Sequence, residues 1–223
     1  MDLSTLEHLG LAHVLKRGTG EILEENETAL LLRDTISQIG MLACEEVELA
    51  LSWLDRHADS MNILMVSNPE IGEIAFSRYG FAANMECYQV AYYGKMPAPD
   101  NRLSLRVATL DDLPIIIEHY HMLDEDELRK VIEQKSMLFG YHEDRLVGFI
   151  GEHLEGSMGL LEIFPEFRRM GYAYSLEQAK IAEIMQKGFV PFAQIDKNNL
   201  PSLKLQEKLG MTRSDRTIMF LWK

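Results

Sequence analysis

Cysteine is almost absent from this 223-residue chain, which contains only Cys44 and Cys87. Each lies in an apolar neighbourhood, so we expect no disulfide framework and a reducing, cytoplasmic compartment. The sequence also has no apolar run of membrane-spanning length, and no basic-then-apolar signal pattern follows Met1. We therefore expect neither a disulfide-stapled secreted module nor a membrane protein.

Positive charge is scarce as well. The chain has 22 Lys and Arg against 35 Asp and Glu, a formal net charge of −13. Binding to a nucleic-acid backbone needs clustered cations, so we expect no nucleic-acid partner. With 47% hydrophobic and 26% charged residues, the composition is that of an ordinary globular protein with one large domain or two small ones.

A strand followed by a helix, residues 159–187, organises the second half of the chain. Residues 160–164 read as a buried strand, which Pro165 ends because proline cannot donate to a sheet. Apolar residues then recur at helical spacing, so a helix begins near Gly171. The turn between them, residues 168–173, aims backbone N–H groups outward at the positive end of the helix dipole. This pattern predicts an anion site, and a basic turn without a ligand is the alternative.

The pattern Pro165-Glu-Phe-Arg168-x-x-Gly171-x-Ala173 resembles the pyrophosphate loop of the GNAT superfamily of CoA-dependent N-acetyltransferases. A second element, residues 199–211, is similar to the superfamily's asparagine-led helix that ends in Leu-Gly-Met. A strand expected at 190–195 separates the two elements in the superfamily's order. The resemblance covers residues 102–223 and implies an α/β (α+β) fold with a mixed, twisted sheet flanked by helices.

This resemblance implies acetyl-CoA as a co-substrate and no metal. Backbone groups of Leu161, Glu162 and Ile163 would pair with the pantetheine arm as an added strand, and Asn199 would reach the pantetheine amides. The cofactor-binding turn would consist of Arg168, Arg169, Met170, Gly171, Tyr172, Ala173 and Tyr174.

The residues that transfer protons in the superfamily do not match in this chain. An amine must be neutral before it attacks a thioester, so a base is needed, and the departing thiolate benefits from an acid. The glutamate that often serves as base matches Ser157. Glu155 is the nearest substitute, on the same face if the strand is regular. Glu162 lies nearer the expected thioester, but its side chain would point to the opposite face of the strand unless a bulge shifts it.

His153 is a third candidate base, and each of the three also reads as an ordinary polar residue of an edge strand. The superfamily's usual acid is a tyrosine, and its matching position here is Gln206. An amide can donate a hydrogen bond to sulfur but cannot give up a proton at neutral pH. We therefore expect Glu155, Glu162 and Gln206 to be the catalytic candidates.

The first half of the chain carries a faint echo of the second. Residues 65–81 and 195–211 align so that Gly80 matches Gly210 (210 − 80 = 130), and an apolar strand follows each glycine. The first half lacks the arginine–glycine loop. We predict a degenerate half-GNAT-like α/β domain at 1–98 and a GNAT-like, acetyl-CoA-binding catalytic domain at 99–223. Such repeats resemble the glycine N-acyltransferase branch, and chance recurrence is the alternative.

Periodicity and turn residues predict the remaining elements. In the first half we expect helices at 3–17, 45–57 and 69–79, a hairpin within 21–43, and strands at 62–66 and 87–93. After a proline-containing linker at 94–102 we expect a strand at 103–107, a helix opened by Thr109-Leu-Asp-Asp and a hairpin over 137–151. The acidic run 124–127 caps another helix or attracts a cationic amine.

We expect an N-acetyltransferase that moves an acetyl group from acetyl-CoA to a primary amine of a small molecule or amino acid. The alternative is a non-catalytic CoA-binding or sensor protein of the same fold. An interaction protein that uses its acidic surface is a third class, which no motif favours. The expected partner is a small-molecule amine, with neither nucleic acid nor membrane, and a homodimer stays open.

Overall fold

The computed structural model describes residues 2–98 and 100–223, which form two compact units. The first unit contains the residues up to Ala91 together with Gln194–Gln206 and Thr212–Lys223. The second contains Tyr92–Ala193 and Glu207–Met211. The division expected at residue 98 stays a prediction. The two compact units divide the chain differently, because the segments Gln194–Gln206 and Thr212–Lys223 pack with the first 91 residues.

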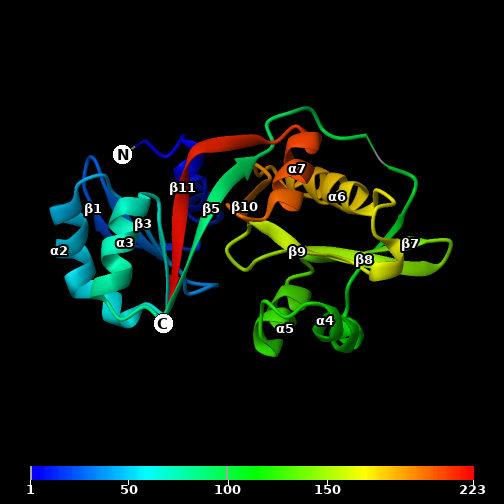
Figure 1. Cartoon of the computed structure of the whole chain (residues 1–223), viewed down its shortest axis with the longest axis horizontal. Helices are drawn as coiled ribbons and strands as arrows, with labels where there is room; N and C mark the ends of the chain where they lie inside the picture. Colours follow the sequence, from blue (N-terminus) through cyan, green and yellow to red (C-terminus); the bar gives the residue numbers. More distant parts are fainter. Residues whose placement is uncertain (1, 99) are drawn as a thin grey trace. The chain divides into compact units, whose positions relative to one another are not determined.

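A seven-stranded sheet with the order β1-β2-β3-β4-β11-β5-β10 is the frame of the first unit. Its strands are β1 (Gly20–Glu25), β2 (Leu30–Asp34), β3 (Gly40–Ala43), β4 (Ile63–Val66), β5 (Ala83–Ala91), β10 (Phe192–Asp196) and β11 (Thr212–Trp222). The C-terminal strand β11 lies between β4 and β5 and is antiparallel to both, with Trp222 opposite Ile63 and Ile218 opposite Cys87 (Figure 1). The last strand of the chain therefore completes a sheet built from the first half.

Helices cover both faces of this sheet. They are α1 (Leu9–Arg17), preceded by the 3-10 turn η1 (Leu6–His8), α2 (Val47–His57), followed by η2 (Ala58–Ser60), and α3 (Pro69–Arg78). Alternate side chains of β11 enter two different cores, as the pleat of a strand requires. Met219 and Leu221 pack with residues of α2 and α3, and Ile218 and Phe220 pack with residues of α1.

The expected echo between the two halves is present as a succession of elements. One repeat is β4, α3 and β5, and the other is β10, α7 (Leu200–Leu209) and β11. Gly80 and Gly210 follow their helices with left-handed φ angles of 72° and 77°, a conformation that glycine adopts without steric cost. The repeats interdigitate, because β11 lies between the two strands of the first repeat and β5 between those of the second.

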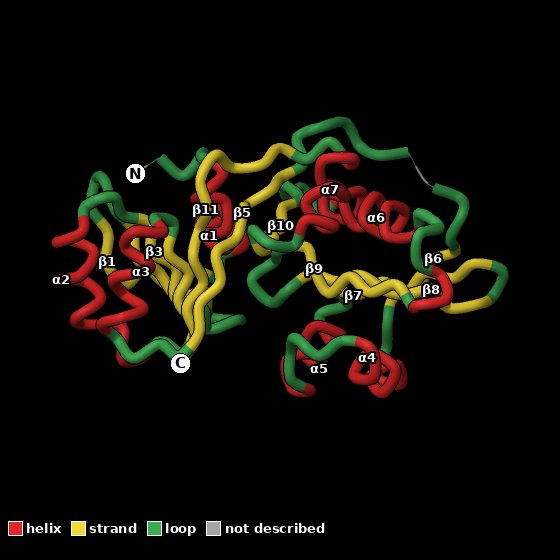
Figure 2. The backbone as a smooth tube through the Cα atoms, viewed as in Figure 1, coloured by secondary structure: helices red, strands yellow, loops and turns green. Residues whose placement is uncertain are grey.

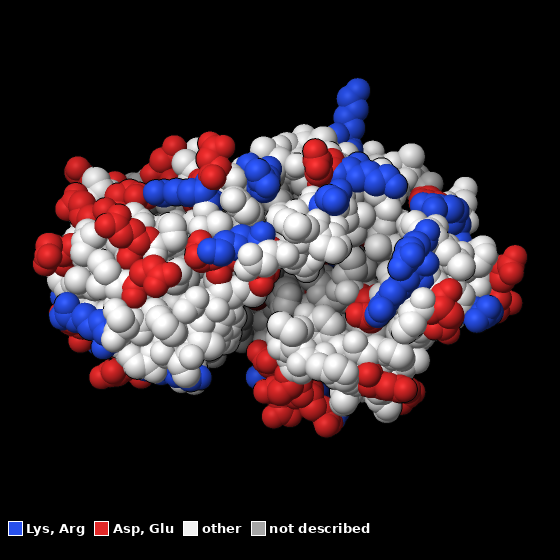
Figure 3. All heavy atoms as spheres, in the orientation of Figure 1, with Lys and Arg blue, Asp and Glu red and all other residues white. Residues whose placement is uncertain are grey.

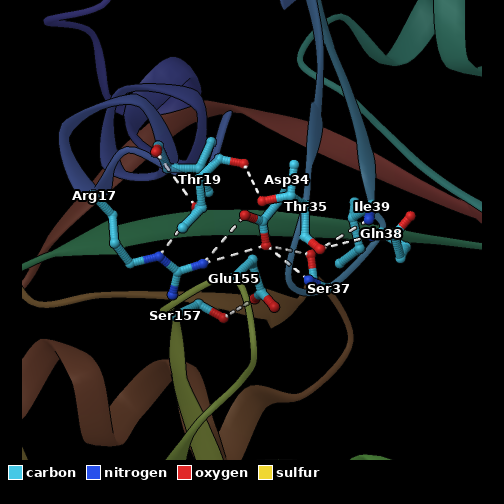
Figure 4. A network of polar contacts seen from close by, with 10 residues as sticks. Arg17, Thr19, Asp34, Thr35, Ser37, Gln38, Ile39, Glu155 and Ser157 are labelled. Atoms are coloured by element: carbon cyan, nitrogen blue, oxygen red, sulfur yellow. Dashed lines mark hydrogen bonds and ion pairs between the residues drawn. The ribbon is translucent and has the colours of Figure 1, made fainter. Parts of the chain in front are cut away.

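A network of polar side chains fixes the turn between β2 and β3 to the end of α1 (Figure 4). The fully buried Asp34 carboxylate accepts hydrogen bonds from Arg17 Nη2 at 3.2 and 3.3 Å and from Ser37 N and Oγ at 2.9 and 2.7 Å. Burial alone raises the pKa of Asp34, but hydrogen bonds from Thr19 and Ser37 and the charge of Arg17 outweigh it and hold the pKa below its usual range. This network stabilises the first unit.

The second unit contains an antiparallel sheet with the order β6-β7-β8-β9. Its strands are β6 (Ser104–Val107), β7 (Met137–His142), β8 (Arg145–Glu152) and β9 (Met158–Ile163). Helix α6 (Tyr172–Gln186) packs on one face, and α4 (Leu113–His119) and α5 (Glu125–Glu133) lie on the other (Figure 2). The short 3-10 turns η3 (Leu110–Asp112) and η4 (Pro165–Phe167) precede α4 and α6.

The acidic run at 124–127 caps α5. Asp124 Oδ1 accepts a hydrogen bond from Glu127 N at 2.8 Å, in a reciprocal capping box. Acidic side chains are dense over α5 and over the β1 and α2 end of the first unit (Figure 3). Capping is therefore confirmed as a role of this run, and attraction of an amine stays a prediction.

Most predicted elements are confirmed. β5 begins at Ala83, four residues earlier than the predicted strand 87–93, and β11 begins at Thr212, although the apolar strand expected after Gly210 spans only residues 218–222. Within residues 2–98 and 100–223, no helix is both long enough and apolar enough to cross a membrane.

Candidate functional site

Strand β9 is the edge of its sheet and carries a bulge. Gly159 pairs with Gly151 and Glu162 with Phe149, so Leu160 and Leu161 together lie opposite the single residue Ile150. Leu160 has a left-handed φ of 48°, which is costly for a residue with a side chain. An edge strand leaves backbone N–H and C=O groups for an added strand, and a bulge turns some of them aside. β9 can therefore pair with an extended, amide-containing ligand.

In the first unit, β3 precedes α2 as β9 precedes α6, but β3 has no unpaired edge. β3 is hydrogen-bonded on both sides, antiparallel to β2 and parallel to β4. The turn that follows β3 contains Glu45 and Glu46 in place of arginines, and Glu45 pairs with Arg216. With both of its edges paired and an acidic turn after it, β3 offers neither of the features expected of a CoA site.

The predicted anion turn, residues 168–173, is joined to β9 by the short 3-10 turn η4. Gly171 is the N-cap of α6 with a φ of 86°, and Arg169 is also left-handed, with a φ of 63°. Arg168, Arg169 and Met170 are exposed. The first N–H groups of a helix have no partner within the helix, so this turn presents donors and positive charge together. The helix start predicted at Gly171 is confirmed, and the turn has the chemistry of an anion site.

Arg168 folds back on the end of β9. Its Nε donates to the carbonyl of Ile163 at 2.9 Å, and its Nη2 donates to Glu162 Oε1 at 2.8 Å. The bulge that Glu162 needed to reach the expected face is present, but its carboxylate is held in a salt bridge. A ligand that pairs with the Ile163 carbonyl would share that oxygen with Arg168 or displace it.

Glu155 does not lie on the strand, so the condition of a regular strand through residues 155 and 157 is not met. It is in the turn between β8 and β9, where Gly156 has a φ of 99°, and β9 begins only at Met158. The carboxylate nevertheless reaches position 157, because Ser157 Oγ donates to Glu155 Oε1 at 2.5 Å (Figure 4). Both side chains are buried, Glu155 at 5% and Ser157 at 0% exposure. The carboxylate thus lies beside the residue that matches the superfamily's base.

His153 lies beside the same turn. Its backbone N–H donates to the carbonyl of Ser157 at 2.8 Å, and its ring packs against the backbone of Gly159. The ring therefore occupies the space that a side chain at position 159 would need.

Tyr120, which we did not expect from the sequence, faces the bulge. It follows α4, and the backbone of Leu160 hydrogen-bonds its hydroxyl. Burial raises the pKa of Tyr120 to about 12, and the negative charges of Glu155, Glu127 and Glu162 act in the same direction. The phenol therefore keeps its proton at neutral pH. No motif or spacing marks Tyr120, because its neighbours come from other elements of the fold.

Asn199 and Gln206 belong to the first unit. Asn199 is exposed, and its Oδ1 accepts a hydrogen bond from Ser202 N at 3.1 Å, which caps α7. Gln206 is 2% exposed. Their roles toward a cofactor stay predictions. Among the described residues, no group of three or more His, Cys, Asp and Glu side chains is arranged to hold a metal ion.

Residues 139–220 match the model of the FR47-like protein family. No curated protein matches the sequence. Solved structures with a similar fold include a Drosophila protein (16% identity, 98% of this chain and 90% of that one covered, TM-score 0.70). They also include a putative GNAT-family acetyltransferase from Novosphingobium aromaticivorans (15%, 93% and 91%, TM-score 0.60). A third is a GCN5-related N-acetyltransferase-like protein from Streptococcus suis (15%, 95% and 93%, TM-score 0.60).

At these identities the structures share the fold, and they share it over nearly the whole chain. The expected mixed, twisted sheet flanked by helices is therefore confirmed. The glycine N-acyltransferase branch stays a prediction.

Proposed function

Given that this chain has the fold of the GNAT acetyltransferases, we propose that it moves an acetyl group from acetyl-CoA to a primary amine of a small molecule or amino acid. One observation carries the proposal: a bulged edge strand, β9, leads through the short turn η4 into the glycine turn at the N-terminus of α6. The pantetheine arm of the donor has amides that pair with an edge strand. Its diphosphate suits the donors of a helix N-terminus.

Glu155 is the base that we propose. Its buried carboxylate accepts the hydroxyl hydrogen of Ser157, so the pair can take a proton from the acceptor amine directly or through that hydroxyl. The neutral amine nitrogen then attacks the thioester carbonyl carbon. A C–N bond forms, the C–S bond breaks with its electron pair on the CoA sulfur, and the nitrogen loses a second proton as the amide forms, which balances the proton that the sulfur takes up.

The leaving thiolate needs a proton or a hydrogen bond, and we propose Tyr120 for this role. Its hydroxyl is protonated at neutral pH and lies against the bulge of β9, where the thioester is expected. Gln206, at the position of the superfamily's tyrosine, can donate only a hydrogen bond to sulfur.

The alternative is a CoA-binding or sensor protein without turnover. Its support is the salt bridge that holds Glu162 to Arg168 and the glutamine at position 206. Such a protein would bind CoA without releasing its thiol.

The test combines calorimetry with CoA and thiol release from acetyl-CoA over a panel of amines, amino acids and polyamines. We expect CoA binding and amine-dependent thiol release. Glu155→Gln should lower kcat by about 10²- to 10⁴-fold and remove the rising limb of the pH–rate profile. Glu166→Gln, an exposed carboxylate of η4, is the control and should have the wild-type rate.

Binding without thiol release on any acceptor would favour the sensor. Absence of CoA binding would refute both functions.

We also propose a cytoplasmic location. Support comes from the two cysteines, which are both free and buried. Burial raises the pKa of the Cys87 thiol to about 12, so this side chain has the character of a core residue.

A further inference from the structure

A guanidinium from the linker stands at the predicted phosphate turn. If Gly171 carried a Cβ atom, Arg102 Nη1 would lie 2.9 Å from it, and Arg102 Nη2 donates to Ser175 Oγ, in the first turns of α6, at 2.7 Å. The Arg102 carbonyl lies 3.3 Å from Nδ1 of His142, at the end of β7. The residue is thus held to the end of β7 through its backbone and to α6 through its side chain.

Asp100 holds this guanidinium in place. Its carboxylate accepts from Arg102 Nε at 3.1 and 3.0 Å and from Nη2 at 2.8 Å, and also from Ser175 Oγ at 2.6 Å. The hydrogen bonds from Arg102, and then that from Ser175, hold the pKa of Asp100 well below its usual range. The Asp100 carboxylate therefore already accepts hydrogen bonds from Arg102 and Ser175, two of the donors at the N-terminal end of α6.

The remaining side of the guanidinium faces Gly171. Asp100 and Ser175 engage Nε and Nη2, so Nη1 is the nitrogen directed at the N-cap of α6. The Arg102 side chain is 48% exposed, so a ligand can reach it from solvent. A cation beside a helix N-terminus is unfavourable without an anion, and Asp100 supplies one when no ligand is present.

We propose that Arg102 binds the CoA diphosphate together with the Gly171 turn, and that Asp100 competes with the diphosphate for Arg102 and Ser175. The inference rests on the proposed use of acetyl-CoA. It adds two linker residues that lie outside the arginine–glycine pattern, and it gives them opposite effects. Arg102 strengthens the binding of the donor, and Asp100 weakens it.

The test measures the affinity of the full chain for CoA by calorimetry. Arg102→Ala removes a charge-assisted contact at a half-exposed site and should weaken binding about tenfold. Asp100→Asn keeps the size of the side chain but removes its charge, and should strengthen binding about threefold. The salt dependence of CoA binding should become shallower in Arg102→Ala.

Arg106→Ala is the matched control. Arg106 pairs with Asp112 at 2.8 Å, with side-chain exposures of 42% and 16%, close to the 48% and 18% of the Arg102–Asp100 pair. This variant should change CoA affinity less than about twofold. Acetyl-pantetheine, which lacks the diphosphate, is the second control. Its KM as acetyl donor should be the same in wild type, Arg102→Ala and Asp100→Asn.

Equal CoA affinity of wild type, Arg102→Ala and Asp100→Asn would overturn the inference and leave the proposed function standing. Weaker binding by Asp100→Asn would overturn the competition. If the wild-type chain binds no CoA, the proposed function itself fails, which is a separate result.

Discussion

Removal of strand β11 should unfold the first unit, although this strand lies at the opposite end of the chain. Ile218, Met219, Phe220 and Leu221 are at most 7% exposed and enter the cores of the first unit on both faces. Burial of each such side chain contributes about 1.5–3 kcal/mol, and four contribute about 6–12 kcal/mol. The net stability of a whole domain is about 5–15 kcal/mol. A chain ending at residue 211, or residues 1–98 alone, should therefore lack a cooperative fold.

Tryptophan fluorescence is the assay, because both tryptophans report on the first unit. Trp53, on α2, is 6% exposed in the core of the first unit, and Trp222 is on β11. In residues 1–98, Trp53 should emit as a solvated side chain. A co-expressed 99–223 fragment with Trp222→Phe should restore the emission of a buried indole.

In the full chain, Leu221→Ala should cost about 2–5 kcal/mol in urea unfolding, while Asp215→Ala, exposed on the same strand, should cost less than about 0.5 kcal/mol. A cooperative melting transition in residues 1–98 alone would refute this reasoning.

Three further predictions concern the site and the core. Gly171→Glu should weaken CoA binding about 10- to 100-fold, because a negatively charged side chain would occupy the anion turn. Gly188→Glu is the control, since Gly188 also has a left-handed φ, 80°, at the other end of α6. Equal CoA affinity of the two variants would contradict the proposed position of the site. Gln206→Tyr should preserve or raise kcat and Gln206→Leu should lower it, and wild-type rates for both would make position 206 structural. Burial, together with the charge of Arg17, lowers the pKa of His13 from 6.5 to about 4. The contribution of this residue to the free energy of unfolding is therefore intact above pH 6.5. It is lost as the pH falls toward 4, at a cost of about 3 kcal/mol. Urea unfolding of wild type and His13→Gln at about pH 7.5 and about pH 4.5 checks this, and equal losses in both proteins would disprove it.

Most helices and strands were predicted correctly because they depend on residues that are close together in the sequence. Thr109 and Asp112 form a capping box where capping residues were expected to open a helix, and Gly171 begins α6 because a left-handed N-cap suits glycine. The turn that carries the candidate anion site was predictable for the same reason. Pattern and spacing express such short-range preferences directly.

Other features depend on contacts between distant segments. The sequence repeat indicated β4, α3 and β5, but nothing in it places β11 between β4 and β5, since that pairing joins residues such as Ile63 and Trp222. The bulge at Leu160 requires a left-handed residue that is not glycine, which no propensity would suggest. The hydrogen bond between the Leu160 backbone and the Tyr120 hydroxyl joins two such distant segments.

The position of β11 also sets the order in which the protein can be made. A ribosome releases the chain from its N-terminus, so β1 to β5 emerge long before the strand that separates β4 from β5. Until the last twelve residues, Thr212–Lys223, leave the exit tunnel, the first unit has an open slot in its sheet and two incomplete cores. Strand pairings this distant in sequence form slowly. During that interval the facing edges of β4 and β5 are unpaired and can hydrogen-bond other strands.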